Sequence, residues 1–231
     1  MSERQRRIYQ TDADRYEALI SREDYLGNIP RALHEIINVD NLDVVDLGAG
    51  TGRLAVMLAP RVKSMHAFDA SEEMLRVCRQ RLEASGLSNW QVEVADHRQL
   101  PLTKHCADLV VSGWSVAYLY VWHPETWHVE LEKWLGEMKR VLRPGSFIVL
   151  FESLGTGHEN PIQLEHLAGY YSWLDETGFQ NKWFRTDLKF RSLEEAEELS
   201  SFFFGDEFGD KVRENNWVIL PECTGVWWLK V

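Results

Sequence analysis

Residues 44–54, VVDLGAGTGRL, constrain this chain more than any other stretch, because an apolar run ending in an acid passes directly into a glycine-rich turn. The apolar run predicts a short buried strand, and Leu54, Met57 and Leu58 share one face of a following helix. Glycine has no Cβ and tolerates positive φ, so backbone amides in such a turn can approach a ligand closely. The helix N-terminus adds unpaired N–H groups and the positive end of the helix dipole. The stretch therefore predicts a cofactor-binding loop.

Strand-like and helix-like segments alternate along the rest of the chain. The expected strands are residues 44–47, 65–69, 90–95, 108–112, 147–151, 183–190 and 224–230. This alternation predicts parallel strands joined by right-handed crossovers, and the last two strands are expected to pair with each other. The predicted fold is α/β: a doubly wound, mostly parallel seven-stranded sheet with helices on both faces and an antiparallel C-terminal hairpin.

Two helix starts carry recognisable capping signals. Ser71 is followed by Glu72 and Glu73, which suit the first turn of a helix. Ser192 and Glu195 form the pattern of a capping box at the head of a helix over residues 192–204. A longer helix is expected where an apolar stripe runs through residues 127–141.

Residues 1–40 are expected to form an N-terminal helical arm ahead of a single Rossmann-like domain, residues 41–231. The arm holds two amphipathic segments, residues 12–20 and a second one in which Pro30 suits the first helical turn. Such an arm can close over the site as a lid. For the second segment, plain packing against the sheet is an equally good interpretation.

Composition excludes several classes of function. A formal net charge of −11 argues against binding a nucleic-acid backbone, which requires clustered lysine and arginine. Cys78, Cys106 and Cys223 have neither disulfide-framework nor metal-ligand spacing, so no metal site is expected. The longest apolar region, residues 107–122, is interrupted by polar residues and is too short for a membrane span. We expect a cytoplasmic protein that binds neither membrane nor nucleic acid and acts on a small molecule.

Five polar residues follow or end the predicted strands: Asp46, Asp69, Asp96, Ser112 and Glu152. In an open α/β sheet, ligands bind outside the carboxyl ends of the strands. The glycine loop begins at the same edge. The sequence therefore places a ligand site where these residues meet.

A nicotinamide dehydrogenase is the obvious alternative, because its loop also contains repeated glycines. That loop needs a third glycine for close packing of its helix, and counting from Gly48 and Gly50 the third position is Arg53. Gly52 gives a different spacing. The dehydrogenase interpretation is therefore weaker, although it stays open.

The sequence resembles the class I S-adenosylmethionine-dependent methyltransferases. The resemblance rests on segments 44–52, 67–75, 94–96, 107–112 and 142–145, which occur in the order typical of that family. They cover about residues 43–151, whereas the C-terminal third matches only in its general pattern. The resemblance implies S-adenosylmethionine as cofactor and a methyl transfer that needs no metal.

Asp69 has the chemistry expected of a ribose ligand. It lies nineteen residues after Gly50 and ends the second predicted strand, and its two carboxylate oxygens can accept both ribose hydroxyls. The resemblance further implies that Gly48, Ala49 and Gly50 carry the methionyl part of the cofactor. Asp46 would orient this loop or meet the cofactor's amino group through water.

The resemblance also implies roles around the adenine ring and the sulfonium. Asp96 would accept the adenine amino group, and Ala70 and His97 would flank the ring. Ser112 would line the pocket near the sulfonium. Two of these positions also have a simpler interpretation, Asp96 as a turn residue and His97 as a surface residue.

The methyl acceptor is not identified by any motif. The chain lacks an Asn/Asp-Pro-Pro-aromatic segment after the fourth strand, so methylation of amino groups of DNA or of protein glutamine is disfavoured. It also lacks any Pro-Cys dipeptide, which excludes the cytosine C5 mechanism. Trp114 and Tyr118, together with Tyr16 of the arm, are candidates for binding an apolar or cationic acceptor. No catalytic residue is assigned.

The leading hypothesis is thus an enzyme that methylates a small molecule at an O, N or C atom. The alternative is a non-catalytic module that binds S-adenosylmethionine or a partner on the same fold, because a fold does not fix a function.

Overall fold

A computed structural model of the chain describes residues 3–231, and its central sheet has seven strands in the order β3-β2-β1-β4-β5-β9-β6. These strands are β1 (Asp43–Leu47), β2 (Ser64–Asp69), β3 (Trp90–Val94), β4 (Ala107–Gly113), β5 (Leu142–Thr156), β6 (Gln180–Arg185) and β9 (Glu222–Lys230). The first five are parallel to one another, whereas β9 is antiparallel to both β5 and β6. The predicted seven-stranded, mostly parallel sheet with an antiparallel C-terminal pair is confirmed.

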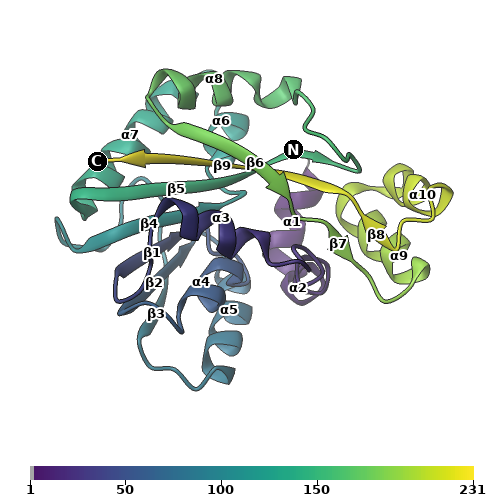
Figure 1. Cartoon of the computed structure of the whole chain (residues 1–231), viewed down its shortest axis with the longest axis horizontal. Coiled ribbons are helices and arrows are strands. Elements are labelled where there is room, and N and C mark those ends of the chain that lie inside the picture. Colours follow the sequence, from purple (N-terminus) through teal and green to yellow (C-terminus); the bar gives the residue numbers. More distant parts are fainter. Residues whose placement is uncertain (1–2) are drawn as a thin grey trace.

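Helices cover both faces of this sheet (Figure 1). They are α1 (Glu3–Thr11), α2 (Ala13–Ile20), α3 (Asn28–Ile36), α4 (Arg53–Leu58), α5 (Glu72–Ala84), α6 (Ala117–Trp122), α7 (Trp127–Val141), α8 (Ala168–Glu176), α9 (Leu193–Phe204) and α10 (Asp206–Glu214). Trp134 of α7 and Tyr170 of α8 pack in the core on one face. Leu33 of α3, Leu58 of α4 and Leu82 of α5 pack in the core on the other.

Both predicted helix caps are present. Ser71 Oγ accepts a hydrogen bond from Met74 N at 3.2 Å, and Ser192 Oγ accepts one from Glu195 N at 3.2 Å. The Glu195 carboxylate reaches back to the backbone N–H of Arg191, one residue before the cap itself. These contacts fix where α5 and α9 begin.

The prediction of one strand over residues 183–190 is wrong, because the chain turns between β6 and a second, two-stranded sheet. That small sheet pairs β7 (Leu188–Lys189) with β8 (Ile219–Leu220). Asp187 lies at the turn: its carboxylate accepts from Arg185 at 2.6 Å and 2.9 Å and from Glu222 N at 3.1 Å. A side chain that binds backbone and side-chain donors on both flanks ends the strand locally.

Residues 186–221 form a lobe that also contains α9 and α10 (Figure 1, right). Its buried apolar residues form a cluster of their own, which takes in Leu19 of α2: Leu19, Leu188, Phe190, Ala196, Leu199, Val212 and Leu220. The sequence did not predict α1, α6 or α10. This lobe matters for function because it packs against the N-terminal arm.

The N-terminal arm is attached at several points. Tyr9 O accepts a hydrogen bond from Ser71 Oγ, and Arg22 pairs with Glu195 at 2.9 Å. Glu23 forms an isolated bridge with Leu188 of the lobe. The helix α3 packs against the sheet, which is the plain packing that the sequence analysis considered for this segment. Segments α1 and α2 instead contact α5 and α9.

Candidate active site

The glycine loop is formed by two close approaches that leave no room for a Cβ. At Gly48, with φ of +64°, a Cβ would lie 1.8 Å from Ser115 Oγ. At Gly52, with φ of +88°, a Cβ would lie 2.7 Å from Cys78 Sγ of α5. Gly52 therefore provides the close helix packing that a dinucleotide loop takes from its third glycine. The next position therefore does not need to be a glycine, and the bulky Arg53 can occupy it.

Asp69 connects the end of β2 to the glycine loop. Its carboxylate accepts hydrogen bonds from Gly50 N at 2.9 Å and from Ser71 N at 2.8 Å. Burial raises the pKa of this carboxyl above its ordinary value. Asp69 thus holds the loop in shape while its remaining lone pairs face a cavity.

We call this cavity, of about 440 Å³, the loop cavity. It lies outside the carboxyl ends of β1, β2 and β3, where the fold predicts a ligand. Six of the residues expected to bind the cofactor line it: Gly48, Gly50, Asp69, Ala70, Asp96 and His97. Met74 and Ser115 also contribute to its wall.

Asp96 and His97 enter the loop cavity from the turn after β3. Arg98 holds Asp96 through its backbone N–H and its Nε, each at 2.8 Å from Oδ1. This pairing lowers the pKa of Asp96 to about 2, so the carboxyl is a permanent acceptor. Burial lowers the pKa of His97, whose Nε2 lies 3.5 Å from Ser115 Oγ.

Asp46, Ala49 and Arg53 all line a smaller cavity of about 30 Å³. Asp46 is 1% exposed, and burial raises its pKa to about 7. Neither of its carboxylate oxygens has a hydrogen-bond partner within residues 3–231. The same holds for Nη1 of Arg53, a buried donor. A buried acid and a buried guanidinium nitrogen without partners are what a ligand with an ammonium and a carboxylate would satisfy.

The expectation that Ser112 lines the pocket is corrected. Its side chain is buried in the sheet, and its Oγ donates to Leu47 O at 2.7 Å. The hydroxyl is therefore satisfied by the neighbouring strand. Gly113, Trp114 and Ser115, which follow it, line the loop cavity instead.

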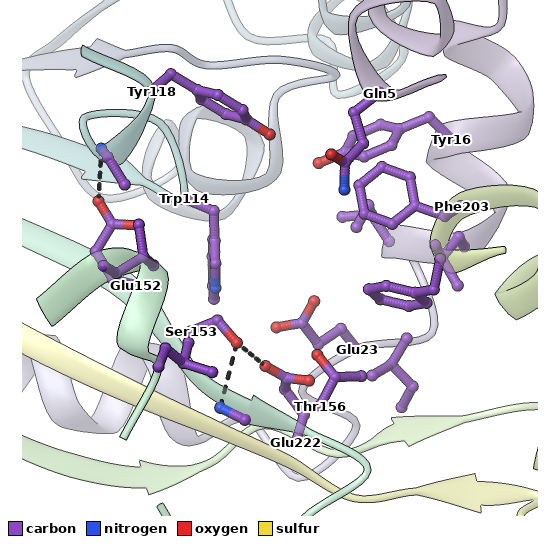
Figure 2. Close-up of a pocket in the computed structure, with 18 of the residues that line it drawn as sticks. Gln5, Tyr16, Glu23, Trp114, Tyr118, Glu152, Ser153, Thr156, Phe203 and Glu222 are labelled. Carbon is purple, nitrogen blue, oxygen red and sulfur yellow. Dashed lines mark hydrogen bonds between the residues drawn. The ribbon is translucent and has the colours of Figure 1, made fainter. Parts of the chain in front are cut away.

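A second cavity of about 360 Å³ lies beyond the loop cavity, and we call it the glutamate cavity. Its lining includes Glu23 of the arm, Glu152 of β5 and Glu222 of β9 (Figure 2). Burial raises the pKa of Glu152 to about 7. Burial, with a further contribution from the Glu23 charge, raises the pKa of Glu222 to about 8.

Four aromatic residues line both cavities: Tyr9, Tyr16, Trp114 and Tyr118. The hydroxyls of Tyr9 and Tyr118 lie 2.5 Å apart, and the rings of Tyr9 and Tyr16 meet edge to face at 5.4 Å. Trp114 has a left-handed backbone, with φ of +52°. A bulky residue in this region of φ is strained, and such strain is concentrated at functional sites. The residues expected to bind substrate, Tyr16, Trp114 and Tyr118, thus stand where the two cavities meet.

Several site residues were not among those predicted from the sequence. Tyr9 and Glu23 belong to the arm, and Phe203 and Glu222 come from the far end of the chain. Their only sequence signal is that aromatic and acidic residues occur there, which is common. They become site residues through the packing of the arm and the lobe around the sheet edge.

Within the part of the chain that the structure describes, no group of three or more His, Cys, Asp or Glu side chains is arranged to hold a metal ion. Nor does any helix there have the length and apolar character that a bilayer span requires.

Residues 44–145 match the model of a family described as "Methyltransferase domain". The chain is 29% identical over 141 residues to malonyl-[acyl-carrier protein] O-methyltransferase of Pectobacterium atrosepticum. The aligned region covers 61% of this chain and 48% of that protein. It is 33% identical over 111 residues to demethylmenaquinone methyltransferase of Thermus thermophilus, covering 47% of this chain and 46% of that protein. The matched regions span about half the length of these curated relatives.

Solved structures extend the likeness to the whole fold. Phosphoethanolamine N-methyltransferase 2 of Haemonchus contortus, in complex with S-adenosylhomocysteine, covers 98% of this chain and 60% of its own, with TM-score 0.62 and 15% identity. The match with a SAM-dependent methyltransferase of Aquifex aeolicus covers 87% of this chain and 89% of that one, with TM-score 0.54 and 16% identity. Residues 44–145 are thus similar to a methyltransferase domain, and the chain has the fold of these solved S-adenosylmethionine-dependent methyltransferases.

Proposed function

We propose that this protein binds S-adenosylmethionine in the loop cavity and transfers its methyl group to a small molecule in the glutamate cavity. The observation that carries the proposal is that the two cavities share Tyr9, Tyr16, Trp114 and Tyr118. A methyl donor on one side and an acceptor on the other would meet at these rings. The methyltransferase names of the relatives support the same reaction.

The residues of the loop cavity fit each part of the cofactor. Asp69 is placed to accept the ribose hydroxyls, and Asp96 and His97 lie at the end where adenine would bind. At the other end, Asp46 and Arg53 complement the ammonium and the carboxylate of the methionyl group. Arg53, which weakened the dehydrogenase interpretation, thereby gains a positive role.

When bound, S-adenosylmethionine supplies an electrophilic methyl group on a good leaving group. The protein therefore needs chiefly to hold the acceptor in line with that methyl, and orientation of this kind can lower the barrier by about 7–11 kcal/mol. Trp114 and Tyr118 are placed to exclude water from the junction. The backbone N–H of Trp114 donates a 2.7 Å hydrogen bond to Phe151 O, and the Arg53 guanidinium lies 4.1 Å from the centroid of its ring. These contacts hold Trp114 in place.

We propose that the chain divides into an N-terminal arm, residues 1–40, and a single domain, residues 41–231. The first part of the arm, α1 and α2, would then form a lid over both cavities. Tyr9 and Tyr16 come from these helices, and ion pairs connect the arm to its neighbours: Glu17 with Arg81 at 2.9 Å and Arg15 with Glu198 at 3.1 Å. Both pairs are partly exposed, and such pairs are individually weak. An arm held in this way can open to admit ligands.

The proposal includes a small-molecule acceptor, no nucleic-acid partner and a cytoplasmic location. The net charge of −11 and the limited size of the glutamate cavity support the first two. The three free cysteines support a reducing compartment.

Thermal unfolding with S-adenosylmethionine, S-adenosylhomocysteine and NAD tests the cofactor. A ligand at 100 times its Kd adds about 2.7 kcal/mol of stability, which corresponds to about 5–10 °C in Tm for a chain of this size. We expect that shift with the first two ligands and none with NAD. A shift with NAD alone would overturn the proposal. Formation of S-adenosylhomocysteine in the presence of a metabolite pool separates an enzyme from a non-catalytic module, which would bind the cofactor without turnover.

A further inference from the structure

We propose that the glutamate cavity selects a small organic amine, with its ammonium held between Glu23 and Glu222 and its carbon skeleton against Trp114 and Phe203. This inference rests on the proposed function, because it names the class of acceptor that the same site takes. It concerns recognition of the acceptor and leaves the methylated atom open.

The first support is the geometry of the two carboxyls. Figure 2 shows Glu23 and Glu222 directed toward one another in the cavity, with Ser153 and Thr156 beside them. Ser153 Oγ donates to Glu222 Oε1 at 2.7 Å, which fixes that side chain. Glu222 is 4% exposed, so bulk water does not screen the pair.

The second support is an acceptor atom without a partner. The Glu23 side chain is 8% exposed, and its Oε2 accepts from Arg53 Nη2 at 2.6 Å. Its Oε1 is buried and has no hydrogen-bond partner in the described chain, residues 3–231. A buried carboxylate oxygen in this condition is costly, and an ammonium donor in the adjoining cavity would satisfy it.

The third support is the balance of charge around the cavity. Glu23, Glu152 and Glu222 line it, and among the described residues Arg53 is the one lysine or arginine that does. His166 is the remaining basic side chain of the lining. Arg53 is already shared between Glu23 and the face of Trp114. A cation bound beside Glu222 would favour the ionised form of this carboxyl, whose pKa burial raises to about 8, and would displace its proton, whereas an anion would gain nothing from the pair.

The fourth support is the aromatic surface opposite the carboxyls. Trp114, Tyr118, Tyr16 and Phe203 line the same space (Figure 2). Aromatic faces attract cations and bury alkyl or aryl groups. A ligand with an ammonium at one end and an apolar body at the other matches both sides of the cavity.

Calorimetric titration of the protein saturated with S-adenosylhomocysteine tests the inference. The probes are 2-phenylethylamine and hexylamine, each matched with its neutral alcohol and with a carboxylate of similar length. We expect both amines to bind about tenfold tighter than the alcohols, as expected when a charged hydrogen bond is gained, and the carboxylates to bind weakest. The variants E222Q and E23Q should lose this preference. The variant E83Q, which neutralises an exposed carboxyl on α5, should keep it.

Equal binding of amines and alcohols, tighter binding of the carboxylates, or no binding of the amines would overturn the inference. So would a preference for amines that survives in both E222Q and E23Q. Each titration is repeated without S-adenosylhomocysteine. A protein that selects amines but does not bind S-adenosylhomocysteine would contradict the proposed function alone.

Discussion

Arg53 Nη2 donates to Glu23 Oε2 at 2.6 Å, and this bond connects the residue that follows the glycine loop to the N-terminal arm. The guanidinium also covers Trp114, at 4.1 Å from its ring centroid. One side chain thus follows the glycine loop directly, bonds to the N-terminal arm and covers the ring between the two cavities. We expect the binding of cofactor and acceptor to be coupled through it.

The role of Arg53 toward the cofactor carboxylate can be isolated with two ligands. The variant R53Q should weaken binding of S-adenosylhomocysteine by about tenfold or more, as expected for a lost charged hydrogen bond. Binding of 5′-methylthioadenosine, which lacks the amino-acid end, should be unchanged. Calorimetry with both ligands checks this, with R61Q, a change to an exposed arginine, as the control. Equal weakening of both ligands would mean that Arg53 acts through the fold.

Replacement of Gly52 by alanine should cost more stability than the same change at Gly86, another glycine with positive φ. Ala at this position meets both the strain of φ +88° and a contact of 2.7 Å with Cys78 Sγ, whereas Gly86, with φ +70°, has open space around it. Steric strain of positive φ costs about 1 kcal/mol, and overpacking adds about 1–3 kcal/mol. Urea unfolding should therefore show a larger loss for G52A than for G86A.

The variant C78A should recover part of the loss in the G52A background, because it removes the contacting sulfur. A double-mutant cycle measures this coupling. If G52A and G86A lower the free energy of unfolding by the same amount, the packing explanation is wrong.

Glu222 should make stability depend on pH in a definite direction. Its pKa rises from 4.5 to about 8 on folding, so between these values the folded protein keeps a proton that the unfolded chain has lost. The stability that this proton provides is complete below pH 4.5 and is lost as the pH rises toward 8, at about 1.4 kcal/mol for each pH unit in between. The Tm of E222Q relative to the unaltered protein should therefore increase from pH 5 to pH 8. A difference in Tm that stays constant from pH 5 to pH 8 would contradict the buried carboxyl pair.

The sheet could be predicted because its signals are local. Asp46, Gly48, Gly50 and Asp69 lie in or beside strongly apolar strands, and their order along the chain places them at one edge. The site residues contributed by that edge were accordingly expected. Ser112 was misplaced because strand alternation does not reveal that Leu47 O takes its hydroxyl.

The glutamate cavity could not be predicted for the opposite reason. Glu23 and Glu222 are 199 positions apart and meet only after the arm and the lobe pack together. The bridge between Glu23 and Leu188 and the turn at Asp187 bring them to the same place. Neither contact has a sequence pattern that distinguishes it from an ordinary surface loop.

The most direct test of the central claim is calorimetric titration with S-adenosylhomocysteine of the unaltered protein, D69A and D210A. Asp210 is an exposed acid on α10 and serves as the control. We predict saturable binding by the unaltered protein and by D210A, and a loss of more than about tenfold for D69A, because the ribose contacts and the bond to Gly50 N are removed together. No binding by the unaltered protein, or equal affinity in D69A, would contradict the placement of the cofactor in the loop cavity.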